Sequence, residues 1–153
     1  MKKLRRKDRE LETNEVIRLL SNCEYGVLST VDENGQPYGV PLNYVYKKNS
    51  IFFHCARVGH KLENMDHNPR VSFCVVGNTK VLPAEFATEY ESAVAFGVAS
   101  EAQGEIKNSA LLWMLEKYSS GFIEEGKSYI EKQHKATTVI KIEIDHISGK
   151  ARR

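Results

Sequence analysis

The stretch from Tyr25 to Cys55, YGVLSTVDENGQPYGVPLNYVYKKNSIFFHC, consists of three apolar or β-branched runs separated by two polar breaks. The first break ends in Asn34 and Gly35, a pair that readily adopts positive φ in a tight hairpin turn. The second break, at residues 47–50, is also polar, so the chain is expected to reverse direction twice. The pattern predicts three consecutive antiparallel strands, at residues 25–31, 38–46 and 51–55.

Pro41 lies inside the second of these runs. Proline has no backbone N–H to donate to a neighbouring strand. It is therefore expected at a sheet edge, at a bulge, or where a ligand meets the backbone. An ordinary edge position and a ligand contact are both open at this point.

The rest of the chain adds strands and helices to this pattern. Residues 13–22 carry apolar side chains at helical spacing after Thr13 and Asn14, either of which can cap a helix. A second short helix is predicted between Ala56 and Pro69, directly after a strand. The remaining predicted elements are strands at 70–76, 92–102 and 137–145 and helices at 108–118 and 122–132. Six strands, mostly in hairpin order, predict a mainly β, α+β fold, namely a six-stranded antiparallel barrel with flanking helices.

The composition indicates one domain. With 153 residues, of which 41% are hydrophobic, the chain can bury a single core. We expect a basic N-terminal segment at 1–12, acting as a solvated tail, followed by one domain at 13–153. The formal net charge of +2 favours no nucleic-acid partner.

Cysteine usage and hydropathy bear on location. The cysteines Cys23, Cys55 and Cys74 show no paired spacing, which is typical of reduced thiols in the cytoplasm. No apolar run approaches the roughly 20 residues that a membrane-spanning helix needs. We therefore expect a cytoplasmic protein without a membrane partner.

The helix predicted after Ala56 begins near Gly59, His60 and Lys61. A helix start offers unpaired backbone N–H groups and a positive dipole end, so it attracts an anion such as a phosphate. A strand, turn and helix with one glycine and one lysine is also a common structural arrangement. The spacing matches neither the phosphate loop of nucleotide hydrolases nor the dinucleotide-binding fingerprint.

His54 follows three apolar residues on a predicted strand, so it is either a hydrogen-bonded structural residue or a group that faces a ligand. A metal site is not expected, because the histidine and cysteine spacings match no familiar ligand pattern. Covalent hydrolysis is not expected either, because Ser29, Cys55 and Ser92 lack the surroundings of a nucleophile.

Several strings, in order, resemble one family. They are RRKDRE at 5–10, EYGVLSTVDENGQPYGVPLNYVY at 24–46, FFHCARVGHKLENMDHNPRVSF at 52–73, VLP at 81–83, YES at 90–92, FG at 96–97 and SGKARR at 148–153. Over almost its whole length the chain is similar to the Nim-type 5-nitroimidazole antibiotic resistance proteins of the pyridoxamine 5′-phosphate oxidase-like superfamily. The resemblance implies an FMN-binding split β-barrel, with FMN usual and FAD possible. It also implies a homodimer with flavin sites at the subunit interface.

The resemblance further implies which residues meet the flavin. Backbone groups of residues 40–43 would bond the isoalloxazine ring, which would account for the proline in that strand. His60 and Lys61 would bind the phosphate, in agreement with the helix start. His54 is the predicted catalytic residue, which would position the substrate or deliver a proton. The full predicted cofactor-binding set is Val40, Pro41, Leu42, Asn43, His54, Cys55, Ala56, His60, Lys61 and Ser92.

The implied activity is reduction of nitro compounds such as 5-nitroimidazoles by hydride transfer from reduced flavin. Oxidases of the wider superfamily usually have Arg-Lys where this chain has His60 and Lys61, and their substrate-binding pattern near the C-terminus is not found. Oxidation of pyridoxamine phosphate is therefore not expected. The alternatives are a non-catalytic flavin-binding redox module and a reductase with an unrelated natural substrate.

Overall fold

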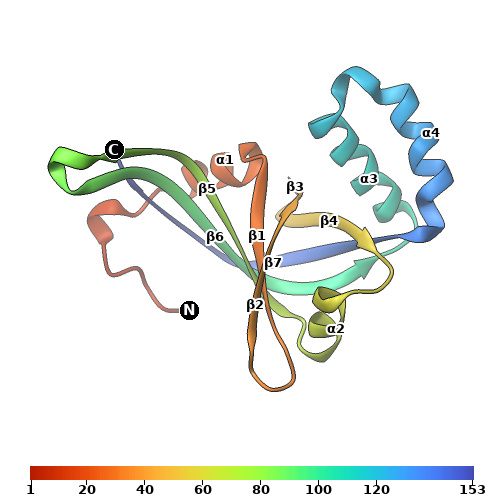
Figure 1. Ribbon diagram of the computed structural model, residues 1–153, viewed down its shortest axis with the longest axis horizontal. Helices are drawn as coiled ribbons and strands as arrows, with labels where there is room; N and C mark the ends of the chain where they lie inside the picture. The colour runs from red at the N-terminus through yellow and green to blue at the C-terminus, as the bar shows by residue number, and fades with distance from the viewer.

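Seven strands pair antiparallel in the order β2-β1-β5-β6-β7-β4-β3 in the computed structural model, which describes all 153 residues. The strands are β1 (Tyr25–Val31), β2 (Pro37–Asn43), β3 (Val45–Lys47), β4 (Ser50–Ala56), β5 (Arg70–Leu82), β6 (Ala87–Ala102) and β7 (Thr137–Arg152). The long strands β5, β6 and β7 run through the length of the molecule, and the short ones flank them (Figure 1).

The two turns predicted in the opening stretch are confirmed. β1 and β2 pair from Val31 opposite Pro37, and Gly35 in the turn has φ of 80°. β3 and β4 are joined through Lys48 and Asn49, with φ of 51° and 58°. Positive φ at both central residues of the β3–β4 turn matches the right-handed twist of a hairpin, whereas in the β1–β2 turn Gly35 alone has positive φ and Asn34 does not.

The predicted second strand is two strands, so the sheet has seven strands rather than six. β2 ends at Asn43 and β3 begins at Val45, on either side of the fully buried Tyr44. The Tyr44 backbone N–H donates to the Tyr118 hydroxyl at 2.9 Å, and its C=O accepts from Lys117 Nζ at 2.9 Å. Because both partners are side chains from a distant helix, the ladder is interrupted at Tyr44.

Three of the predicted strands are longer than expected. β5 and β6 continue beyond the rest of the sheet as a two-stranded arm, and β7 pairs with β6 up to Arg152 (Figure 1). Register shifts lie between Val76 and Thr79 in β5 and at Gly97 in β6. A side chain at Gly97 would collide with the Glu143 carbonyl oxygen, so glycine permits the close approach of β6 and β7.

The predicted helices are all present. They are α1 (Thr13–Asn22), α2 (His60–His67), α3 (Glu105–Tyr118) and α4 (Ile123–Gln133), with short 3-10 turns at Lys7–Arg9, Pro83–Glu85, Ser120–Phe122 and His134–Ala136. The cap of α1 is Glu12 rather than Thr13 or Asn14, and its backbone N–H donates to the Glu15 carboxylate at 3.4 Å. None of the helices has the length and apolar character needed to cross a membrane.

Two apolar clusters hold the fold together, and β4 contributes to both. Phe53 is buried in the larger cluster, inside the barrel, with Phe73. Phe52 points to the opposite face, as neighbours on a strand do, and packs with Ala110 and Met114 of α3. Full burial of a side chain of this size contributes roughly 1.5–3 kcal/mol. β4 therefore connects the barrel to the α3–α4 hairpin.

The end of the basic N-terminal segment packs on the sheet. Glu10 forms an isolated bridge with Lys150 of β7. The Leu11 backbone N–H donates to the Gly149 carbonyl at 2.9 Å, and the Leu11 side chain is buried. These contacts hold the chain against β7 just before α1 begins.

Candidate functional site

Two free strand edges border a split in the barrel. β2 pairs with β1 alone. β4 pairs with β7 along its whole length, but with β3 only through Ser50–Phe52. Residues 53–56 of β4 therefore have no strand partner on one side, and their backbone groups there are available to a ligand.

Most of the predicted cofactor-binding residues lie on these two edges. Pro41 is on the edge strand β2, which is one of the three positions expected for it. The side chains of Val40, Leu42 and Cys55 pack against the larger core cluster. By contrast, the side chains of Pro41, Asn43 and Ala56 are exposed, and that of His54 is partly covered by Met114. The edges thus present alternate side chains to the outside and to the barrel interior.

The start of α2 lies beside β2. The His60 ring stacks on the Tyr38 ring, with centroids 4.0 Å apart and planes at 29°. The helix is held in place by Asn64, which is buried and donates through Nδ2 to Thr30 Oγ1 at 3.0 Å. Lys61, in the first turn of α2, is half-buried. A cation and a helix start therefore lie at one end of the split.

Cys55 lies close enough to Lys61 for their charges to interact. Burial raises the pKa of the Cys55 thiol, and the positive charge of Lys61 acts in the opposite direction. Cys55 is therefore a protonated, packed thiol at neutral pH rather than a reactive thiolate. Arg57 points elsewhere, because its guanidinium donates to the Lys135 carbonyl at 2.8 Å.

His54 faces the α3–α4 hairpin. Its Nδ1 lies 3.3 Å from Met114 Sδ. Partial burial lowers the pKa of His54 below its usual value of 6.5, so the ring is uncharged at neutral pH. In that state it can hydrogen-bond a ligand through a ring nitrogen, but it does not attract an anion.

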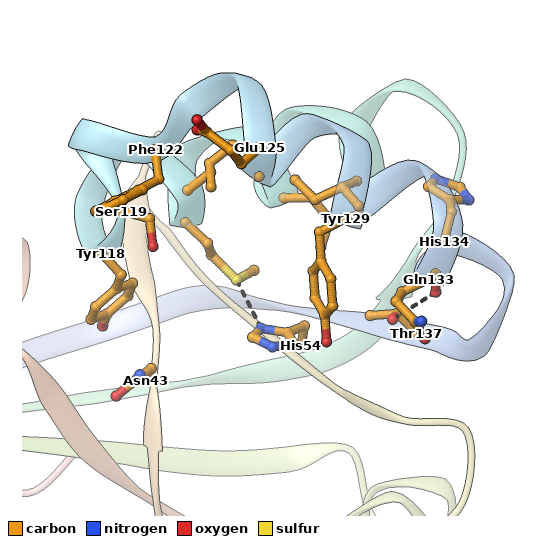
Figure 2. A pocket seen from close by; sticks show the side chains of 15 residues that line it. Asn43, His54, Tyr118, Ser119, Phe122, Glu125, Tyr129, Gln133, His134 and Thr137 are labelled. Carbon is orange, nitrogen blue, oxygen red and sulfur yellow. Dashed lines mark hydrogen bonds between the residues drawn. The ribbon is translucent and has the colours of Figure 1, made fainter.

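A pocket of about 510 Å³ opens between β4, α3 and α4 (Figure 2). Asn43 and His54 contribute to it from the sheet, Tyr118 and Met114 from α3, and Tyr129 from α4. Figure 2 shows Tyr129 pointing from α4 towards β4, beside His54. Small-molecule sites in proteins are clefts of roughly 300–1,000 Å³ with mainly apolar walls, and this pocket has both properties.

Only part of the predicted set of site residues lines this pocket. Asn43 and His54 line one pocket, although they come from opposite free edges. Ser92 does not line this pocket. The residue of β6 that lies level with His54 is Ala102, because both pair with Val139 of β7, and Ser92 lies ten positions away along β6. Ser92 is therefore not part of this pocket.

The helical wall of the pocket was not among the predicted site residues. Phe122 and Tyr129 line the pocket and are 66% and 68% exposed. Phe122 directly precedes α4, and its spacing of seven residues from Tyr129 within the predicted helix 122–132 is the sequence signal for this wall. Trp113 does not line the pocket and packs against Phe52 with ring centroids 5.5 Å apart.

A seven-stranded antiparallel sheet with two free edges, a helix start beside one of them and a ligand-sized pocket is consistent with a split-barrel domain. A family model described as pyridoxamine 5′-phosphate oxidase matches residues 12–151. The chain therefore belongs to the pyridoxamine 5′-phosphate oxidase family, and the membership predicted from the sequence is confirmed. A comparison with curated proteins found no match.

Several solved structures share this fold. One is a protein provisionally named a 5-nitroimidazole antibiotic resistance protein, from Bacteroides thetaiotaomicron, with 21% identity and a TM-score of 0.80 over 93% of this chain and 86% of that chain. A second is an FAD-binding protein from Mesorhizobium loti, with 24% identity and a TM-score of 0.69 over 95% and 98% of the two chains. A third is an FAD and heme binding protein from Mycobacterium smegmatis, with 18% identity and a TM-score of 0.82 over 95% and 74%.

Proposed function

We propose that the protein binds a flavin and is a flavin-dependent oxidoreductase that reduces nitro compounds such as 5-nitroimidazoles. The observation that carries this proposal is that Asn43 and His54, from the two free strand edges, line one pocket, while the start of α2 with Lys61 lies beside the split. Family membership and the names of two FAD-binding relatives support the flavin. The name of the Bacteroides relative supports the class of acceptor.

The residues present fit a flavin. An isoalloxazine ring has hydrogen-bonding atoms along one edge and apolar faces, which suit a free strand edge flanked by Pro41 and Leu42. The phosphate would lie at the start of α2, with Lys61 and His60 next to it. FMN is the expected cofactor, and FAD is the alternative.

Reduced flavin, when bound, supplies hydride to an electron-poor acceptor. His54 would hold the acceptor through a hydrogen bond, and as a neutral imidazole it can still donate from a ring N–H. Aromatic side chains of the α3–α4 hairpin, Tyr118 and Tyr129, would exclude water from the same space.

We also propose a homodimer with the flavin sites at the subunit interface. A row of partly exposed apolar side chains, Val27, Cys74 and Val94, crosses the outer face of β1, β5 and β6, which suits burial against a second copy. Ser92 stays a predicted cofactor contact, and it lies outside the pocket that Asn43 and His54 line. Sedimentation equilibrium should give twice the chain mass of 17.4 kDa, and Val94→Asp should shift the protein towards that single-chain mass.

The three free cysteines support a cytoplasmic location.

The test of the proposed function is an absorption spectrum of the purified protein, with mass identification of the released chromophore. We expect a flavin spectrum and FMN or FAD in the extract. Photoreduced protein should then reduce 1-methyl-5-nitroimidazole without added flavin. Colourless protein that does not take up FMN or FAD contradicts the proposal. Tight flavin binding without turnover would indicate a redox module or a different natural substrate instead.

A further inference from the structure

The pocket between β4, α3 and α4 is separate from the place expected for the flavin phosphate. His60 and Lys61 do not line it, and their helix start lies beside Tyr38 of β2. The pocket meets the split only at Asn43 and His54. It therefore extends from the split away from α2, under the helical hairpin (Figure 2).

The walls of this pocket favour a flat apolar ligand. Tyr118, Phe122 and Tyr129 supply aromatic rings, and Met114 supplies a polarisable sulfur next to His54. Phe122 and Tyr129 are largely exposed to solvent. Exposed apolar side chains that gather at a cavity mark a place where a ligand or a partner binds.

The charges around the pocket favour an uncharged ligand. No lysine or arginine lines it, and Glu125 is its one carboxylate. His134 is hydrogen-bonded through Nε2 to Asn108 Oδ1 at 2.8 Å, so this ring is already engaged. An anion would meet Glu125 without a cation to balance it. For the same reason the propionates of a heme would lack partners here.

We propose that this pocket binds the electron acceptor, and that the acceptor is a planar, uncharged aromatic compound held against Tyr129 and Phe122 with one polar atom at His54. This inference rests on the proposed function, because it divides one site into a flavin part along the strand edges and an acceptor part under the helices. It assigns substrate selection to α3 and α4, which lie outside the predicted set of site residues.

The experiment measures binding to the oxidised, flavin-loaded protein, in which no turnover occurs. Two probes of similar size that differ in charge are compared by isothermal titration calorimetry. They are 4-nitrobenzyl alcohol, which is neutral, and 4-nitrobenzoate, which is an anion. We expect the neutral probe to bind about fivefold more tightly or better, because Glu125 repels the anion. In Glu125→Gln the difference between the probes should shrink.

Two variants test the aromatic wall. Phe122→Ala and Tyr129→Ala should each lower the affinity for the neutral probe by about three- to tenfold, which is the effect expected from the loss of one aromatic contact. Both side chains are mostly exposed, so neither variant should unfold the protein. Phe86→Ala is the matched control, because Phe86 is 97% exposed at the tip of the β5–β6 arm, outside the pocket. Flavin affinity is measured for every variant.

The results separate the two proposals. Weaker probe binding in Phe122→Ala and Tyr129→Ala, with flavin affinity changed by less than about twofold, supports the acceptor pocket. Unchanged probe binding in a flavin-loaded protein overturns the acceptor pocket and leaves the proposed function standing. A parallel loss of flavin affinity assigns the pocket to the cofactor and also overturns it. If the protein binds no flavin, the proposed function fails and the acceptor role fails with it. Hemin binding that is lost in His54→Ala would assign the pocket to another ligand.

Discussion

The backbone N–H of Tyr44 donates a hydrogen bond to the Tyr118 hydroxyl at 2.9 Å, across 74 residues of chain. Tyr44 lies at the break between β2 and β3, and Tyr118 is the last residue of α3. The neighbouring Lys117 donates through Nζ to the carbonyls of Tyr44 at 2.9 Å and of Cys23 at 2.8 Å. Lys117 and Tyr118 therefore tie the helical wall of the pocket to the split in the barrel.

Replacing Tyr118 with phenylalanine should destabilise the fold. Tyr118→Phe removes the hydroxyl and leaves the Tyr44 N–H without its partner, which costs about 1–2 kcal/mol of unfolding free energy. Urea denaturation measures this difference. Tyr129→Phe is the control, because the Tyr129 hydroxyl makes no hydrogen bond within the chain and 68% of this residue is exposed. Equal urea midpoints for the two variants would show that the Tyr118 hydroxyl does not stabilise the chain at the break between β2 and β3.

The stability contribution of Lys117 should depend on pH in a defined direction. Burial lowers the pKa of Lys117 from 10.5 to about 8, so between these values the unfolded chain binds a proton that the folded chain has released. Stability linked to this group therefore rises with pH across that window. The melting temperature of the wild-type protein should increase relative to that of Lys117→Met between neutral pH and about pH 10.

The control for the Lys117 experiment is Lys132→Met, which removes an exposed lysine from α4. Wild type and both variants contain the same cysteines and tyrosines. The effect of their titration on the melting temperature therefore cancels when Lys117→Met is compared with Lys132→Met. If the melting curves of wild type and Lys117→Met shift in parallel with pH, the amine of Lys117 is not buried as the structure has it.

The titration of His54 tests its position against α3. Because burial lowers the pKa of His54 below 6.5, its ring proton resonance should titrate with a midpoint under that value. Met114→Ala opens the space beside Nδ1 and should move the midpoint up towards 6.5. NMR spectra of wild type and His54→Gln assign the resonance. A midpoint at or above 6.5 in the wild type would contradict the half-enclosed geometry.

Lys61 should matter for flavin binding through its charge next to the phosphate. Lys61→Ala should weaken FMN affinity by about tenfold or more, the effect of losing one charge-assisted contact. Quenching of FMN fluorescence on titration measures the affinity. Lys80→Ala is the control, because Lys80 is exposed on the β5–β6 arm. Similar FMN affinities for both variants would remove Lys61 from the phosphate site.

Much of the fold follows from the sequence through local chemistry. Asn34 and Gly35 predict the first hairpin turn, in which Gly35 has positive φ, and an edge strand is one of the positions that Pro41 indicates because it cannot donate to a neighbour. Apolar periodicity places all four helices. The ordered strings shared with one family predict the membership that the family model confirms.

The prediction of six strands is wrong for a reason that local patterns do not contain. Residues 38–46 form an unbroken β-type run, and the break at Tyr44 is caused by Lys117 and Tyr118, which are far away in the chain. The extra lengths of β5, β6 and β7 likewise come from pairing with each other, since a strand continues wherever a partner continues.

By itself the sequence determined the order of turns, strands and helices and the family, because each depends on residues close together or on their linear order. Only the tertiary structure decided that Asn43 and His54 line one pocket, that Phe122 and Tyr129 form its wall, and that Ser92 lies elsewhere in the chain. Those relationships depend on how the barrel curves and on where α3 is anchored, and hydrogen bonds between distant residues fix both.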